Sequence, residues 1–249
     1  MRHTEDRQSA WARYCAEQVR LEELQALVDQ ALQRAAQPVV LEAGCGSATW
    51  FRFPSGCTIV GVDISQEQLD RNEKLSRKVL GDIQTIDLSD VQADVVLSTF
   101  VLEHLDEPLR ALENMARALR PGGIMLLVAP DPFSLPGLVT KLSPHAFHVW
   151  FYRTVLGNPD AGKAGYAPFR APMRAAIRPA AVSKWGAAHG LETVLARSWQ
   201  DYFSWKVGAR SRVARALIGA ARAVSRAASL GKRDPFEATC VVVLHRSQA

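Results

Sequence analysis

The sequence predicts an α/β fold in which helices cover both faces of a doubly wound, mostly parallel sheet. Between residues 39 and 130, short apolar runs alternate with segments of helical periodicity. Such runs are typical of strands that are buried on both faces, and their alternation with helices implies parallel pairing. Seven strands are expected in all, at residues 39–43, 58–63, 78–81, 93–99, 124–129, 191–199 and 240–245.

Four segments organise the chain around this sheet. Residues 5–36 have helical periodicity. Residues 132–178 are rich in proline, glycine and aromatic residues, with a helix-like stretch at 144–156. Other helices are expected from Ser65, a capping residue, to about Arg77, and over residues 108–119 and 179–189. The segments are an N-terminal helical cover (1–36), a cofactor-binding core (37–131), an inserted lid (132–178) and a closing part (179–249) with a basic amphipathic helix at about 207–229.

The composition excludes several classes of protein. With 249 residues, 48% hydrophobic and 22% charged, the chain is typical of a soluble globular protein. No apolar run approaches the about 20 residues that cross a bilayer, and the N-terminus lacks the apolar segment of a signal peptide. The four cysteines form no Cys-x-x-Cys pair, so a reduced cytoplasmic protein without a metal site is expected.

The charges are distributed unevenly along the chain. Residues 1–131 hold 20 acidic and 13 basic side chains, a balance of −7. Residues 132–233 hold 16 basic side chains against three acids, a balance of +13, and residues 234–249 contribute −1, which gives the total of +5. The second half therefore suits a partner or surface of negative charge.

A glycine loop follows the first strand. Gly44 and Gly46 carry no Cβ, so the backbone can turn tightly and come close to a ligand. A strand, a glycine loop and a helix are the usual arrangement for a nucleotide-sized cofactor at the carboxyl edge of a sheet. Asp63 ends the second strand, where a carboxylate can accept hydrogen bonds from ribose hydroxyls. A dehydrogenase is disfavoured, because Thr49 stands where that fingerprint has its third glycine.

Five short motifs occur in order: LEAGCGSAT at 41–49, GVDIS at 61–65, GD at 81–82, VLEHL at 101–105 and LRPGG at 119–123. In this string the chain resembles a class I S-adenosylmethionine-dependent methyltransferase, similar to the small-molecule enzymes of quinone biosynthesis. The resemblance implies the Rossmann-like methyltransferase fold with an inserted lid. It also implies S-adenosyl-L-methionine as the cofactor and S-adenosyl-L-homocysteine as the product.

The resemblance assigns cofactor-binding roles to ten residues. The methionine and ribose part of the cofactor would be lined by Glu42, Gly44, Cys45 and Gly46, and the ribose would be held by Asp63. The adenine would be flanked by Ile64 and Ile83, and its amino group would donate to Asp82. The sulfonium would lie beside Thr99 and Phe100. For Asp63 and Asp82 the alternative is a helix cap or a turn acid.

An oxygen acceptor usually needs a base, most often a histidine. His104, His145 and His148 are the candidates. A helix over residues 144–156 would place His145, His148 and Tyr152 on one face, next to aromatic residues that could enclose an aromatic or lipid-like acceptor. The alternative is a lid helix that is packed by its aromatic residues, with the histidines in solvent. No nearby carboxylate completes a metal site, so none is expected.

The segment 202–233 contains eight Lys or Arg residues and no acid. On a helical wheel Arg212, Arg215, Arg222 and Arg226 fall on one side, and apolar residues gather on the other. Such a helix could lie on an anionic membrane surface or bind a carrier protein. The alternative is a helix that packs its apolar stripe on the domain and leaves its arginines in water.

Together these features predict an enzyme that methylates a small-molecule acceptor, at oxygen, in biosynthetic or secondary metabolism. The basic second half suits an acceptor that is anionic, carrier-bound or lipid-linked. The expected location is the cytoplasm, with peripheral binding at the inner membrane surface. A nucleic-acid methyltransferase is an alternative suggested by the pI of about 9.2, but residues 98–101 lack a (D/N)PP(Y/F) motif. A non-catalytic binding subunit is the second alternative, which the intact glycines and acids of the motifs disfavour.

Overall fold

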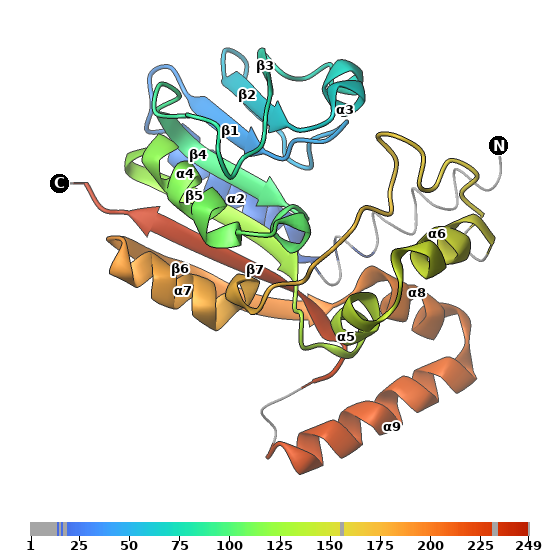
Figure 1. Cartoon of the computed structure of the whole chain (residues 1–249). Coiled ribbons are helices and arrows are strands. Elements are labelled where there is room, and N and C mark those ends of the chain that lie inside the picture. Colours follow the sequence, from blue (N-terminus) through green and yellow to red (C-terminus); the bar gives the residue numbers. More distant parts are fainter. Residues whose placement is uncertain (1–13, 15, 17–18, 155–156, 231–233, 249) are drawn as a thin grey trace.

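The computed structural model describes residues 14, 16, 19–154, 157–230 and 234–248. Its strands are β1 (Val39–Ala43), β2 (Thr58–Asp63), β3 (Arg77–Leu80), β4 (Ala93–Thr99), β5 (Leu119–Pro130), β6 (Leu191–Gln200) and β7 (Glu237–Arg246). They form one seven-stranded sheet in the order β3-β2-β1-β4-β5-β7-β6 (Figure 1). The first five strands pair in parallel, and β7 pairs antiparallel with β5 and β6. The predicted mostly parallel, doubly wound sheet is therefore confirmed.

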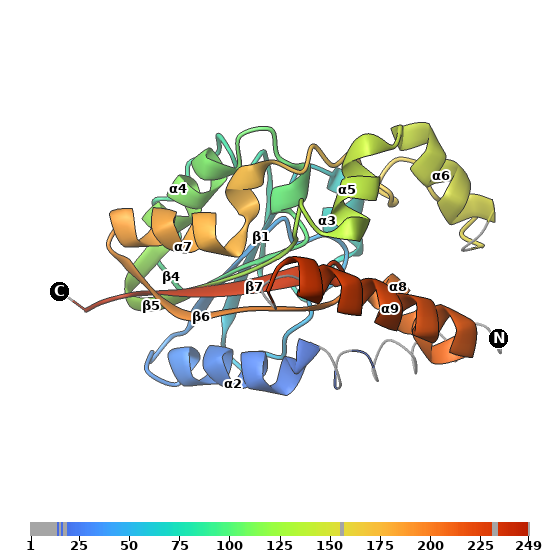
Figure 2. The same cartoon turned by 90° about the horizontal axis from the view of Figure 1, so that it is seen from below.

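Helices cover this sheet on both sides. Figure 2 shows α4 (Pro108–Ala118) and α7 (Pro179–Ala188) on one face and α2 (Leu21–Leu32) on the other. Val40 and Leu41 are consecutive in β1 and point to opposite faces, and both are fully buried, in the apolar clusters around α2 and α4 respectively. A strand between two helical layers needs an apolar side chain at every position, which explains its uninterrupted apolar sequence.

The remaining helices gather near the carboxyl ends of the parallel strands. Figure 1 shows the two lid helices and the two helices that follow β6 at that end of the sheet. They are α5 (Leu135–Leu142), α6 (His145–Thr154), α8 (Tyr202–Arg210) and α9 (Arg212–Ala228), and the chain also contains α3 (Gln66–Arg71) and the 3-10 turns η2 (Leu102–His104) and η3 (Ala175–Ile177). The strand order reverses between β1 and β4, and a ligand crevice is expected where neighbouring connections diverge in this way.

Several local predictions differ from the structure. The described residues between β1 and β2 contain no helix, because Pro54 and Gly56 interrupt a connection that is too short for one. The helix capped by Ser65 ends at Arg71 instead of near Arg77, since Asn72 is extended and the chain turns into β3.

Three further elements differ from the prediction. The single helix predicted at about 207–229 is two helices, α8 and α9, that meet at Ser211. The lid contains α5, which the sequence did not indicate. The LRPGG segment does end α4, yet Leu119 already pairs with Ala93, so the motif forms a bulged start of β5 instead of a loop.

The helix predicted over residues 5–36 lies partly outside the described residues. Its described part, α2, follows Arg20, whose φ of 54° interrupts the regular helix. α2 is fixed to the loop after β1 by a reciprocal pair of hydrogen bonds: the side-chain amide of Gln25 donates to the Arg52 carbonyl (2.8 Å), and the Arg52 N–H donates to the Gln25 side chain (2.9 Å). These two bonds therefore attach α2, which covers one face of the sheet, to the loop that follows β1.

Candidate functional site

The glycine loop turns back at the carboxyl end of β1. The N–H groups of Gly44 and Cys45 donate to the Val62 carbonyl over 2.8 and 3.0 Å. Gly44 has a φ of 72°, and a Cβ on it would lie 2.3 Å from a methyl carbon of Val101. No other residue satisfies both the left-handed conformation and the close approach, which explains the glycine at this position.

Two buried carboxyl groups flank this loop. Glu42 accepts a hydrogen bond from the Thr49 hydroxyl through one oxygen, while its Oε2 atom is buried without a partner. Burial raises the pKa of Glu42 to about 7, because the ionised form loses its hydration. Asp63 accepts from the Gly46 N–H and the Ser65 N–H, both over 2.9 Å. Asp63 thus joins the glycine loop to the N-terminus of α3.

The residues around the loop fit S-adenosylmethionine. A hollow of about 40 Å³ at the end of β1 is lined by Glu42, Gly44 and Thr99, among others. The unpartnered oxygen of Glu42 could accept from the ammonium group of a bound methionine moiety, which would also offset the cost of its burial. Asp63 is not part of the lining of this hollow, but its bond to Gly46 holds it against the glycine loop one residue beyond Cys45, which does line the hollow.

Four of the five remaining predicted cofactor residues, all but Phe100, are placed differently from one another. Ile64 is 75% exposed beside Asp63, in a position to cover a flat apolar ring. Asp82 accepts from the N–H and the side-chain amide of Gln84 (2.8 and 3.0 Å), so it also caps the turn after β3. Ile83 is buried in the core beneath that turn. Thr99 ends β4 at the hollow.

Phe100 stands between this hollow and a second, larger cavity. Its φ of 57° is in the left-handed region, which a bulky residue rarely adopts. The Phe100 N–H donates to the Val128 carbonyl over 2.8 Å, and its ring contacts Trp50 at a centroid distance of 5.3 Å. Trp50 lines the hollow and Phe100 lines the cavity, so the ring contact joins one residue from the wall of each space.

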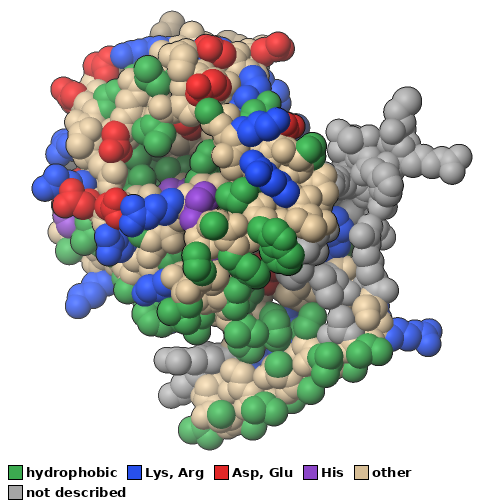
Figure 3. Space-filling model, turned by 45° about the vertical axis from the view of Figure 1, so that its right-hand side comes forward, with side chains coloured by type: hydrophobic (Ala, Val, Ile, Leu, Met, Phe, Trp, Pro, Cys, Tyr) green, Lys and Arg blue, Asp and Glu red, His purple; other side chains and the backbone are tan. Residues whose placement is uncertain are grey.

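The larger cavity has a volume of about 1020 Å³ and lies under the lid. Helices α5 and α6, the segment 167–173, and helices α8 and α9 contribute to its wall. The wall is rich in apolar groups, including Phe147, Phe151, Phe169 and Ile218. Figure 3 shows hydrophobic side chains over this face of the molecule and along the arm below it, which is α9. A molecule with a large apolar part would fit this space.

All three candidate histidines reach this cavity. His145 and His148 line it together with Tyr152, on the helix face that the sequence predicted. The Nε2 atom of His148 lies 2.9 Å from the Ser143 hydroxyl. His104 enters from η2, with its Nδ1 atom 2.8 Å from the Arg170 carbonyl, and burial lowers its pKa. No residue of α6 is fully buried, and His145 is exposed, while Phe147 contacts Trp150 and Phe151 within the helix.

Sequence reasoning missed Glu103, which precedes His104 in η2. Its side chain is buried, its Oε1 atom lies 3.8 Å from the His104 Nε2 atom, and its Oε2 atom has no partner. Burial raises the pKa of Glu103 to about 8. It lines the large cavity. The signal in the sequence was its place in the VLEHL motif at 101–105, to which no role for the glutamate was assigned.

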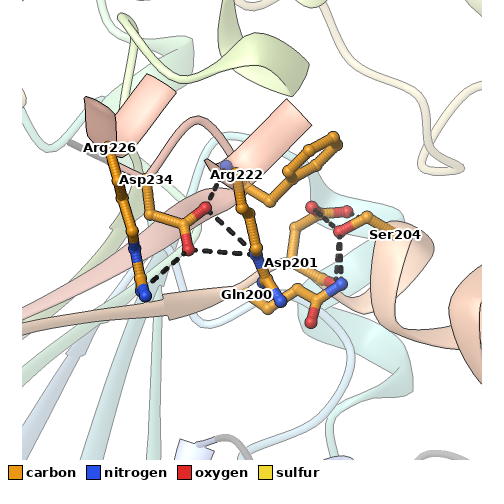
Figure 4. A network of polar contacts seen from close by, with 7 residues as sticks. Gln200, Asp201, Ser204, Arg222, Arg226 and Asp234 are labelled. Carbon is orange, nitrogen blue, oxygen red and sulfur yellow. Dashed lines mark hydrogen bonds and ion pairs between the residues drawn. The ribbon is translucent and has the colours of Figure 1, made fainter. Parts of the chain in front are cut away.

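The basic helix has the opposite orientation to the alternative considered above. Arg222 and Arg226 face inward to the buried carboxylate of Asp234, at 3.0 and 3.4 Å, next to the Gln200–Asp201–Ser204 contacts (Figure 4). Val213, Leu217 and Val224 are instead 70%, 66% and 70% exposed. The part of that alternative that packs the apolar stripe on the domain is therefore wrong, whereas Arg212, Arg215 and Arg226 are exposed, as the alternative expects.

Within the described ranges, no group of three or more His, Cys, Asp or Glu side chains could hold a metal ion. None of the described helices combines the length and the apolar character that a membrane span requires.

Comparison with known proteins agrees with this geometry. Residues 41–127 match the family model described as a methyltransferase domain. A malonyl-[acyl-carrier protein] O-methyltransferase of Enterobacter lignolyticus is 33% identical over 104 residues, which cover 40% of this chain and 41% of that protein. An uncharacterized 37.1 kDa protein of transposon TN4556 from Streptomyces fradiae is 35% identical over 107 residues, covering 38% and 31%. The chain therefore spans less than half the length of these two relatives.

The fold extends beyond the matched domain. The crystal structure of a "putative sarcosine dimethylglycine methyltransferase" from Galdieria sulphuraria superposes with a TM-score of 0.52 at 16% identity, over 92% of this chain and 84% of that one. At this identity the likeness concerns the fold alone. The family match, the strand order and the motifs around Gly44 and Asp63 together identify residues 41–127 as a methyltransferase domain of the class I S-adenosylmethionine-dependent type, with S-adenosylmethionine as its cofactor.

Proposed function

We propose that this protein transfers a methyl group to a hydroxyl oxygen of a large, mainly apolar small molecule in biosynthetic or secondary metabolism. The observation that carries the proposal is the position of Phe100. On one side of its ring contact lies the cofactor hollow, and on the other lies the 1020 Å³ cavity with its aromatic wall. An acceptor in that cavity would meet the cofactor at the end of β4.

Bound S-adenosylmethionine supplies an electrophilic methyl group, and the protein contributes position and exclusion of water. Ten residues are proposed to hold this cofactor, in the roles that the family resemblance implies. They are Glu42, Gly44, Cys45, Gly46, Asp63, Ile64, Asp82, Ile83, Thr99 and Phe100. The buried, unpartnered oxygen of Glu42 at the hollow supports the assignment, and the burial of Ile83 in the core leaves it a supporting contact behind the ring site.

An oxygen acceptor must lose its proton as the new bond forms. We assign this proton to one of His148, His145 or His104, which share the cavity. His104 is suited to accept it, because a donor bond from its Nδ1–H to the Arg170 carbonyl would leave Nε2 as the basic nitrogen, and its lowered pKa keeps the ring neutral. Replacement of the residue that acts should lower kcat by about a hundredfold or more, with little change in KM.

The acceptor is proposed to come from a surface instead of free solution. The malonyl-[acyl-carrier protein] methyltransferases suggest a carrier-bound acceptor, whereas the structure favours a lipid surface. The exposed side of α9 is apolar, with Arg212 at its margin, and Ile218 on its other side lines the cavity. An anionic bilayer offers both an apolar interior and negative headgroups to such a helix. A cytoplasmic protein that binds the inner membrane surface would combine these properties.

Two experiments test the function in order. Calorimetry with S-adenosylmethionine should show binding, and no binding at millimolar concentration would overturn the methyltransferase proposal. The protein with methyl-labelled S-adenosylmethionine should then transfer label to a fraction of apolar metabolites from an extract, and not to RNA or DNA. Label in nucleic acid would establish the alternative methyltransferase class instead.

A further inference from the structure

The side chain of Glu103 is buried, and one of its two carboxyl oxygens has no hydrogen-bond partner in the described structure. Its carboxyl group is 5% exposed, in a turn whose neighbours Leu102 and Leu105 are also buried. The Met173 N–H donates to the Glu103 carbonyl over 3.2 Å, which holds the segment 167–173 across the turn. The side chain receives no such support, because its Oε2 atom has no hydrogen-bond partner within the described structure.

A buried carboxyl oxygen without a partner is costly, and a leucine of similar size would fit this turn at lower cost. A glutamate is explained if a ligand supplies the missing partner. The cavity wall contains Glu103, so such a ligand would be the acceptor itself. The wall also contains other polar side chains, such as His104 and Arg170, but among the described wall residues Glu103 is the one with a buried side-chain oxygen that lacks a partner.

We propose that Glu103 is the polar recognition point of the acceptor cavity, and that it hydrogen-bonds a hydroxyl group carried by an otherwise apolar acceptor. A hydroxyl can donate to the free Oε2 atom without bringing a charge into the cavity. A carboxylate or phosphate ligand would instead place its charge beside that of Glu103 whenever Glu103 ionises. This inference rests on the proposed function, in which the same cavity receives the methyl acceptor.

The test uses two probes that differ at one group, 2-naphthol and 2-methoxynaphthalene, and requires no cofactor and no turnover. Binding to the full chain is measured by fluorescence titration. The wild type should bind 2-naphthol about tenfold more tightly, which is the effect of one hydrogen bond to a buried group. Glu103→Leu should remove this preference, and Glu103→Gln should keep part of it, because an amide oxygen still accepts.

Glu107→Gln is the matched control, since Glu107 is exposed, four residues further along, and paired with Arg110. It should leave the preference unchanged. Binding of S-adenosylmethionine to each variant reports whether the fold is intact, and its failure in the wild type would remove the proposed function without affecting the probe result. The inference is overturned if the wild type shows no preference between the probes, including binding of neither, or if Glu103→Leu retains it.

Discussion

The cofactor core and the acceptor half of this chain are built by different rules. In the core, residues 39–130, strands and helices bury nearly every apolar side chain, and the functional groups follow the ends of strands. In the second half, the lid and α9 leave large apolar side chains exposed, including Leu142 at 79% and Val213 at 70%. The core therefore directs most of its apolar side chains inward, whereas the surfaces of the second half are suited to contacts with other molecules.

The glycine loop tests how rigid the core is. Gly44→Ala should weaken S-adenosylmethionine binding at least about a hundredfold, because it combines a strained left-handed backbone with a Cβ 2.3 Å from Val101. Gly56→Ala is the control: its φ is 82°, but a Cβ there meets nothing within 4 Å. Both variants introduce backbone strain, and only Gly44→Ala introduces a clash with Val101. Calorimetry and urea unfolding of both variants therefore distinguish the effect of the strain from that of the clash. Equal losses in the two variants would contradict the proposed close approach.

The pH dependence of stability tests the burial of Glu42. Its pKa rises from 4.5 to about 7 on folding, so the folded protein favours the protonated form. Its contribution is fully present below pH 4.5 and is lost as the pH rises to 7, by roughly 2–3 kcal/mol. The free energy of unfolding of Glu42→Gln minus that of the wild type should therefore increase over this window. A constant difference in urea unfolding at pH 4.5 and 7.5 would show that Glu42 is not desolvated.

The ribose contact is tested at Asp63. Asp63→Ala should weaken S-adenosylmethionine binding about tenfold, since it removes a charged acceptor of hydrogen bonds. Asp70→Ala provides the control on α3, because Asp70 is exposed and its carboxylate accepts only from the Gln66 side chain among the contacts described. Calorimetric affinities that agree among the wild type and both variants would disprove the ribose assignment.

The exposed face of α9 is expected to show the smallest effect. The double variant Leu217→Asp with Val224→Asp should leave the melting temperature within a few degrees, because both side chains are already exposed, and reduce sedimentation with anionic vesicles about threefold. Val194→Asp, on an exposed position of β6, is the control. Retained vesicle binding, combined with capture by an acyl carrier protein, would favour the carrier over the membrane.

Sequence reasoning was most successful where structure follows from local pattern. The bounds of β1, β2 and β4 agree with the prediction, because an apolar run between polar residues determines a central strand almost alone. It failed where long-range contacts decide. The orientation of α9 depends on Asp234, which helical periodicity cannot reveal, and the role of Glu103 depends on the burial of a turn under residues 167–173. The acceptor residues in general belong to this second kind.

The position of β7 in the sheet has a consequence for how the chain is synthesised. β5 pairs with β4 on one side and with β7 on the other, and more than a hundred residues separate Pro130 from Thr239 as they are translated. Until Glu237–Arg246 has left the ribosome, β5 offers a free apolar edge, which favours pairing with other nascent chains. Nascent chains of this protein on the same polysome should therefore aggregate unless a chaperone covers β5. A chaperone should co-purify with a ribosome that is stalled before Glu237.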